Sequence, residues 1–316
     1  MTLSFGKYVL LLLTLGIPGG CSTPLPPGVP TNSLAHNYVH DGSTIHYKDI
    51  GAGRAVVFIH GFGASLEVWR QMEDALKDEY RLVLFDLKGH GYSARPHDDR
   101  YSLKDHASVV LGLLEHLKLD NVVLVGHSYG CAVALMASLQ AQESFSGKVS
   151  GLVLIAGSID PENLPFYLRL LRLPVIGWVT ANLTPVDIGT RRILKRAYHD
   201  DERVTESLIE RYAKYQRIAG TAHALLTTAR QMVPPDFSAL RQELQSLKLP
   251  VLKIIGKYDE IISPDSGKAL CRILPNCRAV IIDDVGHVPH DEKPGETIPL
   301  VRDFISKTSQ RFGRYR

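Results

Sequence analysis

Short apolar runs recur along the chain, and each is followed by a segment rich in glycine, histidine or charged residues. A run that is apolar nearly throughout predicts a strand covered on both faces, because a strand with one solvated face would alternate apolar and polar positions. The predicted strands of this kind are residues 55–59, 81–85, 121–125, 151–155, 251–255 and 279–282.

A hairpin precedes these strands, because Asp41 and Gly42 separate two short strand-like segments, residues 38–40 and 44–47. Between the later strands, apolar positions repeat with a helical period. The clearest such face consists of Ala107, Val110, Leu111, Leu114 and Leu117. Strands alternating with helices predict an α/β fold with a mostly parallel central sheet flanked by helices. Ligands of such sheets bind at the carboxyl ends of the strands.

The alternation stops between residues 160 and 237, where the pattern is helical and is punctuated by Pro161, Pro165, Pro174 and Pro185. No convincing buried strand occurs in this stretch of the sequence. We therefore predict an inserted helical cap over residues 160–237. It separates a first part of the α/β core, residues 36–159, from a second part, residues 238–316.

The first 35 residues differ from the rest of the chain. Lys7 precedes an apolar run of ten residues, 8–17, which ends in Pro18-Gly19-Gly20-Cys21. A charged start, a short apolar segment and small residues predict a secretory signal over residues 1–21. A spanning helix needs about 20 apolar residues, so this run is too short to be one.

The small residues directly before Cys21 also resemble a bacterial lipoprotein signal, in which the cysteine is lipidated and anchors the protein to a membrane. Residues 22–35 are rich in Pro, Gly, Ser and Thr, as expected of a flexible linker. We expect an exported protein that is either a membrane-anchored lipoprotein or, after plain signal cleavage, periplasmic or secreted.

Composition narrows the class of protein further. The 316 residues are 45% hydrophobic and 22% charged, which suits a sizeable core, and the net charge of +3 gives no support for nucleic-acid binding. Neither a Cys-x-x-Cys nor a His-Glu-x-x-His spacing occurs, so the sequence supports no metal site. Cys271 and Cys277 are either partners in an oxidising compartment or buried thiols.

The strongest chemical signal is Gly126-His127-Ser128-Tyr129-Gly130, which lies between the predicted strand 121–125 and a helix-compatible stretch, residues 131–140. A serine on so sharp a turn stands clear of the sheet, and the two glycines remove side chains that would collide there. The N-terminus of the following helix favours negative charge near the reacting oxygen. An ordinary glycine-rich turn is the alternative, but the position of the motif between a predicted strand and a predicted helix favours Ser128 as a nucleophile.

With these residues, the sequence from about residue 36 to residue 310 resembles the α/β-hydrolase family. In that family the nucleophile precedes the acid and the acid precedes the histidine. Ser128, Asp259 and His287 follow this order, each after a predicted strand. The resemblance implies that His287 moves the serine proton and that Asp259 orients the imidazole. The competing candidates nearby are Glu260 and Asp284 for the acid, and His290 for the histidine.

The segment His60-Gly61-Phe62-Gly63 follows the predicted strand 55–59 and resembles the family's oxyanion loop. The resemblance implies that the backbone N–H groups of Phe62 and Tyr129 form the oxyanion hole.

The expected function is that of a serine hydrolase that cleaves carboxylic esters, including lipase-like substrates, through an acyl-enzyme intermediate. The expected partner is therefore a small-molecule or lipid ester, with no cofactor, no nucleic acid and a possible membrane anchor at Cys21. One alternative is a carbon–carbon bond hydrolase of ring-cleavage products. Another is a ligand-binding homologue that has no activity. The sequence gives no oligomeric state.

Overall fold

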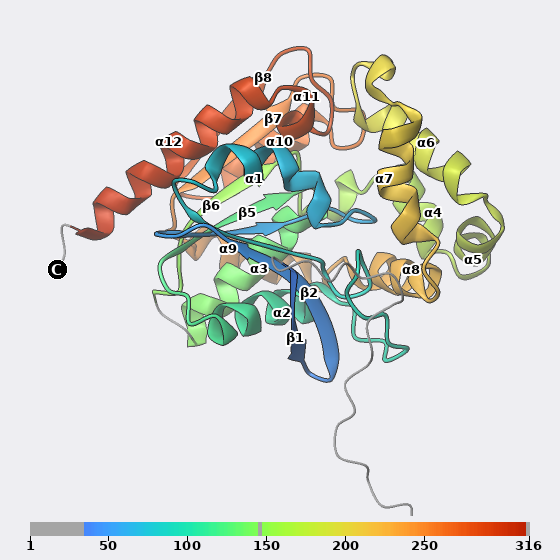
Figure 1. Cartoon of the computed structure of the whole chain (residues 1–316), viewed down its shortest axis with the longest axis horizontal. Helices are drawn as coiled ribbons and strands as arrows, with labels where there is room; N and C mark the ends of the chain where they lie inside the picture. The colour runs from blue at the N-terminus through green and yellow to red at the C-terminus, as the bar shows by residue number, and fades with distance from the viewer. Residues whose placement is uncertain (1–34, 145–146, 314–316) are drawn as a thin grey trace, which may run out of the picture.

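One sheet of eight strands runs through the computed structural model, which describes residues 35–144 and 147–313 (Figure 1). The predicted signal segment, Cys21 and the linker up to residue 34 lie outside the described residues. The strands are β1 Ala35–His40, β2 Ser43–Ile50, β3 Ala55–Ile59, β4 Arg81–Phe85, β5 Val122–His127, β6 Val149–Ile155, β7 Val251–Gly256 and β8 Cys277–Ile282.

The strand order across the sheet is β1-β2-β4-β3-β5-β6-β7-β8. The pairs β1–β2 and β2–β4 are antiparallel, and every later pair of neighbours is parallel. The predicted hairpin is β1–β2, and Asp41 and Gly42 form its turn with φ angles of 46° and 75°. The mostly parallel sheet with flanking helices confirms the predicted fold class.

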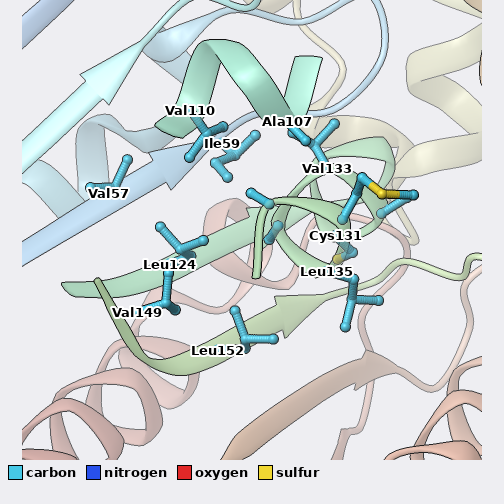
Figure 2. Close-up of a cluster of buried hydrophobic side chains, with 14 of the residues drawn as sticks. Val57, Ile59, Ala107, Val110, Leu124, Cys131, Val133, Leu135, Val149 and Leu152 are labelled. Carbon is cyan, nitrogen blue, oxygen red and sulfur yellow. The ribbon is translucent and has the colours of Figure 1, made fainter. Parts of the chain in front are cut away.

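Alternate side chains of the central strands enter two separate apolar layers. Val57 and Ile59 of β3 join the layer beneath α2 and α3, whereas Val56 and Phe58 join the layer beneath α1 and α12. Figure 2 shows side chains of β3, β5, α2 and α3 meeting in the first layer. The core helices are α1 Arg70–Leu76, α2 Leu103–His116, α3 Tyr129–Ser144, α9 Phe237–Ser246, α10 Pro264–Ile273, α11 Pro289–Glu292 and α12 Pro294–Gly313, with the 3-10 turn η1 Leu66–Trp69.

Helices fill the segment between β6 and β7. They are α4 Phe166–Arg172, α5 Pro174–Leu183, α6 Val186–Ala197, α7 Glu206–Gln216 and α8 Thr221–Gln231, with the 3-10 turns η2 Pro161–Asn163 and η3 Asp201–Arg203. These helices lie together on the right of Figure 1, beyond one end of the sheet. No helix in the described part of the chain is long and apolar enough to cross a membrane.

Strand β8 corrects one expectation. It forms the edge of the sheet, and Ile281 is 43% exposed, so β8 is not covered on both faces as the apolar run 279–282 suggested. Its first residue, Cys277, forms a disulfide with Cys271 of α10, and their Cα atoms are 5.1 Å apart. Of the two states that the sequence allowed for these cysteines, the structure therefore has the bonded one.

Candidate active site

The site lies where the sheet order reverses. β4 lies on one side of β3 and β5 lies on the other, so the connections that leave β3 and β5 diverge at their carboxyl ends. A crevice at such a switch point is the usual ligand site of an open α/β sheet. Here β3 leads into the loop at Phe62, and β5 leads into Ser128.

Ser128 occupies a left-handed backbone conformation, with φ of 53°, between β5 and α3. The turn around it is too tight for side chains at its flanks. A Cβ atom on Gly126 would lie 2.4 Å from the carbonyl oxygen of Gly130, and one on Gly130 would lie 2.2 Å from the carbonyl oxygen of Ile59. Both glycines of the motif are thus required by close backbone approach.

His287 links Ser128 to Asp259 through hydrogen bonds. Its Nε2 atom is 2.9 Å from the Ser128 hydroxyl oxygen, and its Nδ1 atom is 2.8 Å from Oδ2 of Asp259. The other oxygen of Asp259 accepts hydrogen bonds from the backbone N–H groups of Ile261 and Ile262, each at 2.8 Å. His287 and Asp259 are buried, which excludes water from their contact.

Two further side chains hold the loop that carries His287, although the sequence marks neither of them as a support. Glu292 accepts a hydrogen bond of 2.7 Å from the Gly286 backbone N–H and one of 2.8 Å from that of His199. Burial raises the pKa of Glu292. His127 contacts the His287 carbonyl oxygen through Nε2, at 2.9 Å.

The alternatives for the acid and the histidine lie elsewhere. Glu260 is exposed and is 3.9 Å from Arg196, and exposed Asp284 is 3.7 Å from Lys293. His290 is buried against the rings of Trp69 and His127. Burial lowers its pKa to about 4, so it is neutral near pH 7. The structure thus brings Asp259 and His287, rather than these three, to Ser128.

The predicted oxyanion donors flank the serine. A Cβ atom on Gly61 would lie 3.0 Å from the Ser128 Cβ, so the loop that carries Phe62 packs directly against the nucleophile. Tyr129 is the first residue of α3, and its N–H therefore has no acceptor within the helix. The Tyr129 hydroxyl contacts Nδ1 of buried His106 at 2.9 Å. Its backbone, rather than its hydroxyl, is therefore the group available to a substrate.

Two cavities adjoin Ser128. The smaller has a volume of about 60 Å³ and is lined by the first turn of α3, the segment after β6 and residues near the end of α8. The larger has a volume of about 430 Å³ and lies beneath α4, α5 and α6. Phe62 and Ser128 line both, whereas His287 lines only the larger and Tyr129 only the smaller. Their charged lining side chains are Asp160 in the smaller and Arg192 in the larger.

Among the described residues, no cluster of three or more histidine, cysteine or acidic side chains could hold a metal ion. Cys131 of α3 is buried, and burial raises the pKa of its thiol to about 11, so it is not a competing nucleophile.

The region of the chain that matches known proteins includes Ser128, Asp259 and His287. A family model described as alpha/beta hydrolase fold matches residues 54–294. The chain is 27% identical over 285 residues to an uncharacterized hydrolase of Bacillus subtilis, with 86% of this chain and 98% of the relative covered. It is 26% identical over 271 residues to a 2-hydroxy-6-oxo-2,4-heptadienoate hydrolase of Pseudomonas putida, with 84% and 94% covered. A thermophilic esterase from Thermogutta terrifontis has a similar structure, with a TM-score of 0.72, 23% identity, and 87% and 98% covered.

Proposed function

The chain belongs to the α/β-hydrolase family, and we propose that it is a serine hydrolase that cleaves carboxylic esters through an acyl-enzyme intermediate. The observation that carries the proposal is the continuous contact from the Ser128 hydroxyl through His287 to Asp259. A serine hydroxyl is a weak nucleophile, and an adjacent base held by a third group activates it.

The proposed reaction gives each of these groups a role. The Ser128 oxygen attacks the ester carbonyl carbon while Nε2 of His287 takes its proton. The carbonyl oxygen becomes an oxyanion that faces the N–H groups of Phe62 and Tyr129. When the carbon–oxygen bond breaks, His287 gives the proton to the departing alkoxide. Water then attacks the acyl-enzyme, with His287 as base, and the acid product leaves as Ser128 regains its proton.

The cavity linings favour an ester over an anionic substrate, because they are mainly apolar. Carbon–carbon bond hydrolysis is the second candidate. The Pseudomonas putida relative is named for a dienoate, which is a carboxylate, and Arg192 in the larger cavity would offer such a group a cation.

A direct comparison of the two reactions tests the proposal. Hydrolysis of p-nitrophenyl acetate and cleavage of a vinylogous diketone acid are measured with the same preparation, and Ser128→Ala serves as the control for both. We expect kcat/KM to be about a hundredfold higher for the ester, since a site selects by differential transition-state binding. A higher kcat/KM for the diketone acid would favour the second candidate.

We also propose that the protein is exported and anchored through a lipid on Cys21. The charged, apolar and small-residue pattern of residues 7–21 supports this, and the Cys271–Cys277 disulfide fits an oxidising compartment. In bacteria fed a labelled fatty acid, the wild type and Cys131→Ser should carry the label and Cys21→Ser should not. Label that survives in Cys21→Ser would contradict the anchor.

A further inference from the structure

The two cavities beside Ser128 differ in size and in their access to His287. The larger, of about 430 Å³, includes His287 in its wall, and the smaller, of about 60 Å³, does not. Both reach Ser128 and Phe62, so a bound ester can extend a substituent into each.

The reaction determines which substituent enters which cavity. In the tetrahedral intermediate the carbonyl carbon carries the Ser128 oxygen, the oxyanion, the departing oxygen and the acyl chain. The oxyanion faces Phe62 and Tyr129, and the departing oxygen must lie within hydrogen-bond reach of His287 Nε2 to receive its proton. The alcohol portion therefore lies on the His287 side, and the acyl chain takes the remaining direction, toward the smaller cavity.

We propose, on the basis of the proposed ester hydrolysis, that the preferred substrates carry a short acyl group and a large apolar alcohol. The smaller cavity, of about 60 Å³, has roughly one seventh of the volume of the larger, of about 430 Å³. The smaller space suits an acetyl or propionyl group, and the larger space suits a longer apolar chain.

Two isomeric esters test the assignment. Octyl acetate and ethyl octanoate have the same formula and differ only in which side of the ester bears the long chain. We expect kcat/KM for octyl acetate to be about tenfold or more above that for ethyl octanoate, since surplus methylenes that do not fit a small pocket cost that much. Equal values or a preference for ethyl octanoate would overturn the inference. Failure to hydrolyse even ethyl acetate, which fits either way, would instead overturn the proposed function.

Two variants identify the cavity in use. Ala181 of α5 lines only the larger cavity, and Met232 after α8 lines only the smaller. Ala181→Phe should lower the ratio of kcat/KM for octyl acetate to kcat/KM for ethyl acetate about tenfold. Met232→Ala should raise kcat/KM for ethyl octanoate. A loss in Ala181→Phe that falls on ethyl octanoate alone would show that the acyl chain occupies the larger cavity.

A different observation concerns the outer face of α5. Its inner face is turned toward the rest of the cap: Gly177 is buried near Leu171 and Leu226, and Ala181 lines the larger cavity. The outer face leaves large apolar side chains in solvent. They are Val175 at 75% exposure, Leu183 at 66%, Trp178 at 55%, Ile176 at 45% and Val179 at 42%.

The exposed apolar side chains concentrate in the cap. Eight of the eleven large exposed hydrophobic side chains in the described part of the chain lie between Phe166 and Ile188. An apolar surface of this kind marks an interaction site. Residues 173–186 include no charged side chain, and the neighbouring helix α4 carries Arg169 and Arg172 but no acid. An apolar segment with a tryptophan beside two arginines suits the interface of an anionic bilayer.

We infer that α5 docks on an anionic lipid surface, with its inner face turned toward the larger cavity. Figure 1 shows α5 at the periphery of the cap, on the side away from the sheet, where a planar surface can reach it. The position suits a hydrolase whose substrates partition into lipid.

Trp178 reports on this contact directly. The chain has two tryptophans, and Trp69 is fully buried in the core. With vesicles of phosphatidylcholine and phosphatidylglycerol, we expect the emission to shift to the blue and to be quenched by lipids brominated on their acyl chains. Both effects should vanish in Trp178→Phe. Because all variants share residues 1–34, the N-terminal segment contributes equally to each.

Val175→Asp and Leu183→Asp should each weaken binding to the vesicles about tenfold, as measured from the lipid concentration that gives half of the emission shift. Each substitution removes apolar area and adds an anion to the contact. Absence of any shift with vesicles would overturn the inference. So would a blue shift that depends on protein concentration without lipid, because a second copy of the chain would then cover α5.

Discussion

The Nδ1 atom of His287 lies 2.8 Å from Oδ2 of Asp259, and both residues are buried. The other carboxylate oxygen of Asp259 is held by two backbone N–H groups of its own loop. The aspartate can therefore accept a hydrogen bond from the Nδ1–H group, which leaves Nε2 of His287 free to accept the proton of Ser128.

Replacing Asp259 with asparagine should preserve the fold and remove this control of the imidazole. We expect kcat to fall by about 10⁴, because an amide at this position favours the wrong tautomer of His287. Steady-state hydrolysis of p-nitrophenyl acetate measures the loss. Glu260→Gln and Asp284→Asn are matched controls and should stay within about twofold of the wild type, since both side chains are exposed and paired outside the site. A comparable loss in either control would assign the acid elsewhere.

We expect the protein to become less stable in mild acid, because several of its histidines are buried. Burial lowers the pKa of His46, His90 and His290 to about 4 and that of His60 to about 3. Unfolding restores a pKa near 6.5, so below that pH the unfolded chain binds protons that the folded chain does not. The free energy of unfolding should therefore fall as the pH drops from about 6.5 toward 4. Burial raises the pKa of Asp86 to about 7 and also raises the pKa of Glu292, which acts in the opposite sense, but these are two groups against four.

His290 offers a specific test of this dependence. Neither of its ring nitrogens has a hydrogen-bond partner, so His290→Leu removes a titrating group without breaking a polar contact. Urea unfolding between about pH 6 and pH 5 should show a slope that is shallower than that of the wild type by about 1 kcal/mol per pH unit. An unchanged slope would show that His290 is not neutral in the folded chain.

The disulfide between Cys271 and Cys277 predicts a redox-dependent stability. It closes a loop with a sequence separation of six, and a loop of this size contributes about 2 kcal/mol to the free energy of unfolding. The double variant Cys271→Ser/Cys277→Ser should lose that amount, as measured by urea unfolding. A reducing agent should destabilise the wild type similarly and leave the double variant unchanged. If the reducing agent leaves the free energy of unfolding of the wild type unchanged, the prediction is contradicted.

The sequence predicted the core of the fold well, because the buried parallel strands are marked by composition alone. Residues 55–59 and 81–85 match β3 and β4 as their apolar runs suggested. The exception is β8, whose run is equally apolar although the strand lies at the sheet edge. Its position depends on which strand pairs with β7, and that long-range choice leaves no trace in the run itself.

The candidate site was accessible to sequence reasoning to the extent that its residues follow strands. Ser128, Asp259 and His287 each lie just beyond a strand end, and the sheet brings those ends together. Glu292 escaped notice because its role depends on a fold-back of the chain that brings its carboxylate to the Gly286 N–H. The cavities of the cap also escaped notice, since they depend on how helices pack and not on any single motif.

Labelling with a fluorophosphonate probe tests the central claim most directly, because the probe reacts only with an activated serine. Peptide mass spectrometry of the labelled wild type should locate one adduct on Ser128. Ser128→Ala, shown by circular dichroism to be folded, should carry none. An unlabelled wild type, as expected of an inactive binding homologue, or labelling that persists in Ser128→Ala would contradict the claim that Ser128 is the nucleophile.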